Sequence, residues 1–149
     1  MRGDHERCVV DASAILPLVD FERFSPRAEQ WFATVREHAE ESLTVDLFDA
    51  ECANALWKRV RRELWSTRRA EQALRQILDL PFRRVPVGVV VGDALTLAAT
   101  TGLTVCDACY VALAVTSGLP IVTADRRLAR VAREAGCDVL CLSEEATTP

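Results

Sequence analysis

The segment GLPIVTADRRLARVAREAG, residues 118–136, combines a short apolar run, an aspartate and a helical pattern that ends at a glycine. A strand followed by a helix is the building unit of a parallel sheet, because parallel strands need a long crossover between them. Similar β-rich runs recur along the chain and predict strands near 7–10, 42–45, 83–87, 120–123 and 138–142. The alternation of strands with helical segments predicts an α/β protein with three layers, in which helices cover both faces of a mainly parallel sheet.

Residues 47–79 depart from this alternation, because two helical patterns follow one another with no strand between them. We expect a helical hairpin beside the sheet, with a first helix over 47–64 and Thr67 capping the second. The 149 residues suit a single domain over 1–149.

The composition favours a packed protein of a reducing compartment. Hydrophobic residues make up 50% of the chain and charged residues 27%, which is far from disordered compositions. No apolar run approaches the roughly 20 residues that a membrane helix needs, and no apolar segment follows the charged N-terminus, so we expect a cytoplasmic protein. The six cysteines are then expected to be free and mostly buried thiols, because disulfides are rare in such a compartment. Cys106-x-x-Cys109 and Cys137-x-x-x-Cys141 superficially resemble zinc pairs, but neither lies on the tight loop of a zinc knuckle.

Four acidic residues stand in or at the end of apolar stretches: Asp11, Glu51, Asp107 and Asp125. An isolated buried carboxylate is costly and becomes protonated, whereas several that converge on a hard cation stay ionised. Ligands bind at the carboxyl edge of parallel sheets, and the predicted topology brings these acids to that edge. The pattern therefore predicts a Mg²⁺ or Mn²⁺ site with hydrolytic chemistry.

Each acid also has an ordinary structural explanation. Asp11 and Asp125 suit helix N-caps, and Thr104-x-x-Asp107 matches a capping box. Glu51 is harder to explain in this way, because it shares an apolar helix face. Ser13 and Thr123 are placed to hydrogen-bond the carboxylates, and Asn54 lies one turn from Glu51, but local backbone or surface roles suit these three residues equally well.

Four segments of the chain form a recognisable set: VVDASAIL (9–16), DAECANAL (49–56), TVCDACYVALA (104–114) and GLPIVTADRRLARVAREAG (118–136). Together they resemble a PIN-domain ribonuclease of the VapC toxin type, and the resemblance covers nearly the whole chain. It implies a three-layer α/β/α fold and Mg²⁺- or Mn²⁺-dependent cleavage of RNA by metal-activated water, with Asp11, Glu51, Asp107 and Asp125 as the acidic quartet. It also implies a homodimer that a cognate VapB-type antitoxin neutralises.

The basic residues are clustered despite the net charge of −4. A basic surface beside an acidic centre attracts a polyanion through its local potential. Solvated helix faces explain such clusters just as readily. We expect RNA phosphates to contact, in particular, Arg59, Arg62, Arg126 and Arg127.

The hairpin is also the expected partner surface. Trp57 and Trp65 fall two helical turns apart on roughly one face, which suits an antitoxin segment in a groove, although a place in the core is equally compatible.

Two other classes of function compete with a nuclease. A phosphatase or receiver module of similar layout is disfavoured, because Ser13 stands where such a phosphatase needs a second aspartate and the one lysine is Lys58. The alternative that stays open is a non-catalytic PIN-like module that binds RNA or protein.

Overall fold

The computed structural model describes residues 5–20 and 25–144, and the side chain of Ser25 is outside the described part. These residues form a five-stranded sheet in the order β3-β2-β1-β4-β5, in which all neighbouring strands are parallel. The strands are β1 (Val9–Val10), β2 (Leu43–Val45), β3 (Arg83–Val85), β4 (Ile121–Thr123) and β5 (Val139–Cys141). All five predicted strands are confirmed, each shorter than its sequence pattern.

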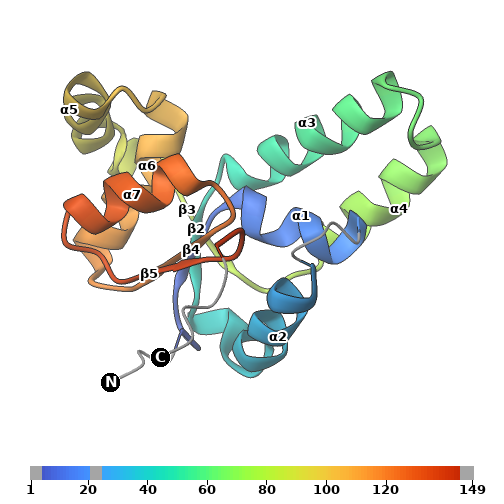
Figure 1. Cartoon of the computed structure of the whole chain (residues 1–149), viewed down its shortest axis with the longest axis horizontal. Coiled ribbons are helices and arrows are strands. Elements are labelled where there is room, and N and C mark those ends of the chain that lie inside the picture. Colours follow the sequence, from blue (N-terminus) through green and yellow to red (C-terminus); the bar gives the residue numbers. More distant parts are fainter. Residues whose placement is uncertain (1–4, 21–24, 145–149) are drawn as a thin grey trace.

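Two groups of helices cover the two faces of the sheet (Figure 1). One face carries α1 (Ala12–Asp20), α2 (Ser25–Val35), the 3-10 helix η1 (Arg36–Glu41), α3 (Phe48–Arg61) and α4 (Thr67–Leu78). The other carries the 3-10 helix η2 (Val87–Val89), α5 (Val91–Thr101), α6 (Val105–Ser117) and α7 (Arg126–Glu134). The predicted three-layer α/β fold is thereby confirmed.

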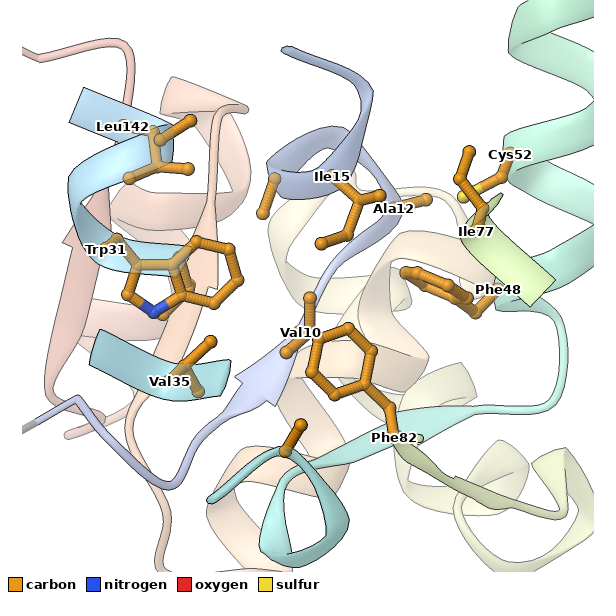
Figure 2. Close-up of a cluster of buried hydrophobic side chains, with 14 of the residues drawn as sticks. Val10, Ala12, Ile15, Trp31, Val35, Phe48, Cys52, Ile77, Phe82 and Leu142 are labelled. Atoms are coloured by element: carbon orange, nitrogen blue, oxygen red, sulfur yellow. The ribbon is translucent and has the colours of Figure 1, made fainter. Parts of the chain in front are cut away.

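The central strand β1 divides two apolar cores, because successive side chains of a strand point to opposite faces. Val10 belongs to the core beneath α1–α4, where Figure 2 shows Trp31, Phe48 and Phe82 around it. Val9 belongs to the second core, with Tyr110 and other side chains of α6. Both valines are fully buried, which explains why this strand is continuously apolar.

The predicted helical hairpin is present as α3 and α4, which extend together away from the sheet in Figure 1. Its boundaries differ from the sequence prediction. Helix α3 ends at Arg61 rather than at residue 64, and Glu63 takes a positive φ of 58°. Ser66 caps α4 by accepting a hydrogen bond from the Arg69 amide, so the expected cap at Thr67 is wrong by one residue.

Within the described residues, no single helix is long and apolar enough to cross a membrane. Helices α5 and α6 pass such a test only as a pair, which is bent by 114°. The cysteines are free; four of them are buried, Cys137 is partly buried and Cys106 is exposed.

Candidate metal-dependent active site

The carboxyl ends of β1 and β4 lie side by side at the centre of the sheet, where the strand order changes direction. The chain winds outward from β1 to β3 on one side and returns to β4 on the other. Such a reversal leaves a crevice between the loops that leave the two strands, and this is where open parallel sheets bind ligands. Asp11 directly follows β1, and Asp125 follows β4 by two residues.

Glu51 and Asp107 reach the same place from helices on opposite faces of the sheet. Glu51 lies in the first turn of α3 and Asp107 in the first turn of α6. A pocket of about 220 Å³ is lined by all four acids, and its other lining residues are Ala12, Ser13, Leu16, Asn54, Ala55 and Lys58. The convergence predicted from topology is therefore present in the structure.

Two hydroxyl groups hold Asp11, which is 4% exposed. Ser13 Oγ donates a hydrogen bond to Asp11 Oδ2 over 2.5 Å, and Thr123 Oγ1 donates to the same oxygen over 2.7 Å. Both hydroxyls also accept from the backbone, Ser13 from the Ala124 amide and Thr123 from the Asp125 amide. This network joins the β1 and β4 loops and orients Asp11, which supports the predicted role of Ser13 and Thr123.

Helix capping, the ordinary structural explanation of these acids, accounts for one carboxylate oxygen of Asp125 only. Its Oδ1 accepts hydrogen bonds from the Arg127 and Leu128 amides and so caps α7. At Asp107 the cap is Thr104, whose hydroxyl accepts from the Asp107 amide. Asp11 is bound by hydroxyl groups rather than by the amides of a helix start. Helix capping therefore does not explain why these acids share one pocket.

The negative charges of the pocket acids repel one another. The pKa of Asp11 is raised to about 6, mainly by burial and to a smaller degree by the charges of Asp107 and Asp125, while the hydrogen bonds from Ser13 and Thr123 lower it. Burial also raises the pKa of Glu51 to about 7, helped by Asp11 and Asp107. The pKa of Asp107 is raised as well, first by burial and then by Asp125, whereas Thr104 and Arg127 lower it. Raised pKa values at several neighbouring acids are typical of functional sites.

Glu51 has a buried oxygen, Oε1, with no hydrogen-bond partner among the described residues, and the buried Tyr110 hydroxyl is likewise unpartnered there. Tyr110 lies one turn after Asp107 on α6, and its hydroxyl is close enough to lower the pKa of Glu51. An unsatisfied buried carboxylate oxygen among other acids is the place where a cation would be stabilised.

A divalent hard cation fits this donor set. Among the described residues, no three His, Cys, Asp or Glu side chains are gathered closely enough to hold one ion directly. Mg²⁺ does not require such a cage, because it keeps several waters and binds through one or two carboxylates and substrate phosphates. A pocket lined by four acids and open to solvent suits that mode of binding.

The basic residues expected to contact RNA have different surroundings. Arg59 is paired with Asp20 and lies 5.9 Å from the Trp65 ring. Arg126 donates to the Ser143 carbonyl and Arg127 to the Gly102 carbonyl, and both are exposed at the start of α7. Arg62 is exposed at the end of α3. The sequence reasoning did not assign two residues of the site, Lys58 in the pocket lining and Tyr110 beside Glu51.

A family model described as "PIN domain" matches residues 8–134. "Ribonuclease VapC3" of Pyrobaculum aerophilum is 40% identical over 126 residues, which cover 83% of this chain and 92% of that protein. "Ribonuclease VapC3" of Mycobacterium tuberculosis is 34% identical over 125 residues, covering 84% of this chain and 87% of the relative. The chain therefore belongs to the PIN-domain family, among its VapC-type members.

Solved structures agree with this fold. PAE2754 from Pyrobaculum aerophilum superposes with a TM-score of 0.66 at 29% identity, covering 89% of this chain and 90% of that one. FitAcB from Neisseria gonorrhoeae superposes with a TM-score of 0.63 over 93% and 99% of the two chains, and at 15% identity it supports the fold alone.

Proposed function

We propose that this chain is a metal-dependent endoribonuclease, the toxin of a type II toxin–antitoxin module, and that residues 1–149 form one PIN domain. The observation that carries the catalytic part is the convergence of Asp11, Glu51, Asp107 and Asp125 on one pocket at the reversal point of the sheet. The ribonuclease names of its relatives support RNA as the substrate.

The four acids would hold one or two Mg²⁺ or Mn²⁺ ions. Such an ion supplies Lewis acidity toward the scissile phosphate and lowers the pKa of the water that attacks it. Ser13 and Thr123 keep Asp11 oriented toward the pocket through their hydrogen bonds to Oδ2. The Tyr110 hydroxyl lies beside Glu51, and Asn54 lines the pocket, where it would contact the ribose or a phosphate.

This arrangement needs no side-chain nucleophile or histidine base. His5 and His38 lie beside Asp138 and Glu41 respectively, outside the pocket lining. The presence of all four acids in one pocket favours catalysis over the alternative of a PIN-like module that only binds RNA or protein. Arg62, Arg126 and Arg127 would contact the backbone of RNA, so that its shape rather than its sequence guides recognition.

An antitoxin partner is part of the proposal. A largely apolar groove of about 220 Å³ runs between α3 and α4 and includes Leu56, Trp57, Val60 and Leu74. Trp57 is 51% exposed there, whereas Trp65 is 8% exposed and belongs to the core. The two tryptophans therefore do not share one face as the spacing suggested, because the chain leaves α3 before Trp65. An amphipathic segment of a VapB-type antitoxin would cover Trp57, since α3 carries both the groove and Glu51.

The proposal also includes a homodimer, to be checked by sedimentation equilibrium, and a cytoplasmic location, which suits free buried thiols and can be checked by cell fractionation.

The test of the nuclease proposal is incubation of antitoxin-free protein with total RNA in Mg²⁺, in Mn²⁺ and in EDTA, beside the variants Asp11→Asn and Asp107→Asn. Discrete fragments that need the metal and are absent with both variants are expected, and mapping their ends would identify the target RNA. Well-folded protein that leaves RNA intact in both metals would favour the non-catalytic alternative.

A further inference from the structure

One residue of the pocket lining has the opposite charge to its neighbours. Lys58, the single lysine of the chain, borders the same pocket as the four acids. It lies seven residues after Glu51 on α3, two helical turns further along the same face, with Asn54 between them. The helix that supplies an acid to the site therefore also brings a cation to its rim.

The Lys58 side chain is exposed and makes no hydrogen bond or ion pair within the part of the chain that the structure describes. Nearby arginines are engaged. Arg59 pairs with Asp20, Arg84 pairs with Asp49, and Arg61 lies 5.3 Å from the Trp57 ring. Lys58 is thus a cation at the pocket whose donors remain available to a ligand.

Lys58 is not among the groups that stabilise the ionised form of the pocket acids, so this role does not explain its position at the pocket. The groups that lower the pKa values of Asp11, Glu51 and Asp107 are hydroxyls and Arg127. A lysine ammonium is a compact, flexible point charge, and it binds a single phosphate oxygen without requiring a planar partner. The carboxylates of the pocket repel an anion such as a phosphate, and a nearby positive charge offsets this repulsion.

We propose that Lys58 binds the RNA phosphate next to the scissile one, so that the strand leaves the pocket along α3. Arg62, the C-cap residue of α3, continues this path, because it follows Lys58 by four residues, which corresponds to a rise of about 6 Å. The inference rests on the ribonuclease function proposed above and adds a residue and a direction for the substrate. Binding through backbone phosphates positions the strand without reading its bases.

The test measures the salt dependence of RNA binding. Fluorescence anisotropy with a labelled single-stranded RNA in Mg²⁺, in an Asp107→Asn background that prevents cleavage, gives the association constant over a series of salt concentrations. Each phosphate contact contributes about 0.7 to the slope of log K against log salt for a single strand. Lys58→Met and Lys58→Gln should each reduce the magnitude of this negative slope by about 0.7, and Lys58→Arg should retain it. Lys58→Met combined with Arg62→Met should reduce the magnitude by about 1.4.

The matched control is Arg36→Met. Arg36 is exposed in η1, which precedes β2 and so lies at the opposite edge of the sheet from the pocket. This variant should keep the slope of the background protein. In the active chain, Lys58→Met should raise KM for RNA more than it lowers kcat, with an unchanged melting temperature.

The outcomes separate the inference from the function on which it rests. If the unaltered chain cleaves RNA but the slope is the same with methionine or glutamine at position 58, the assignment of Lys58 is wrong and the nuclease proposal stands. If the unaltered chain neither binds nor cleaves RNA, the proposed function itself fails.

Discussion

Thr123, the last residue of β4, donates its hydroxyl hydrogen bond to Asp11 Oδ2 over 2.7 Å, across 112 positions of sequence. The same hydroxyl accepts from the Asp125 amide over 3.0 Å. One side chain thus fixes the relative positions of two acids from two neighbouring strands. Because Thr123 is fully buried, water cannot replace either bond.

Replacing Thr123 by valine keeps the shape and removes both bonds. An unsatisfied buried group costs about 1–3 kcal/mol, so Thr123→Val should lower the free energy of unfolding by about that amount. The pKa of Asp11 should rise further, since the hydroxyl lowers it now. Chemical denaturation and RNA cleavage measure the two effects. Thr123→Ser, which keeps the hydroxyl, should retain most activity; equal loss in both variants would show that packing, not the hydroxyl, matters.

The free energy of unfolding of the metal-free protein should fall as pH rises from about 4 to above 7, because the acids of the pocket ionise in this range. The pKa values of Asp11, about 6, and Glu51, about 7, exceed their ordinary values, so the folded state binds more protons than the unfolded state in this window. Stability is therefore lost as these groups ionise. Thermal unfolding across pH, compared with Glu51→Gln, isolates the effect, and the variant should show a shallower decline. A parallel decline in both proteins would rule out this contribution of Glu51.

Added Mg²⁺ should counter that loss. Ligands that bind the folded state alone stabilise it by RT ln(1 + [L]/Kd), and protons compete with the cation for the same carboxylates. We expect a larger rise in melting temperature with Mg²⁺ at pH 8 than at pH 5. Asp107→Asn should reduce the rise, and equal stabilisation by Mg²⁺ in this variant would place the cation elsewhere.

Trp57 and Trp65 should behave in opposite ways. Trp65→Ala removes a buried aromatic side chain and should cost about 3–5 kcal/mol of stability. Trp57→Ala changes an exposed side chain, so folding and RNA cleavage should be retained while inhibition by the antitoxin weakens at least tenfold. Inhibition assays with the purified antitoxin measure this. Unchanged inhibition would remove the α3–α4 groove from the interface.

Much of the fold follows from patterns that are local in sequence. The five apolar runs became strands, and the two consecutive helical patterns became α3 and α4. The end of α3 could not be predicted, because its stop depends on Glu63 in a positive-φ conformation that usually marks a glycine. The strands are shorter than the apolar runs because only part of each run pairs with a neighbouring strand, as Val9 and Val10 do within the predicted strand 7–10.

The gathering of the four acids in one pocket was predictable, because the carboxyl ends of parallel strands meet at one edge of the sheet. The ion-pair partners of individual side chains could not be predicted. Asp20 pairs with Arg59 across 39 positions and Asp49 with Arg84 across 35, which no local pattern reveals. Lys58 was visible only as part of a basic run, although its spacing of seven from Glu51 was a usable signal.

Single-turnover cleavage of RNA over a Mg²⁺ titration, by antitoxin-free natural chain and by Glu51→Gln, would show whether the four acids form a metal-dependent active site. We expect saturable, Mg²⁺-dependent cleavage by the natural chain and none by the variant. The metal-free variant should nevertheless be at least as stable above pH 7, because it lacks one repelling charge. Equal cleavage in EDTA, or full activity of Glu51→Gln, would contradict a metal-dependent site built on these four acids.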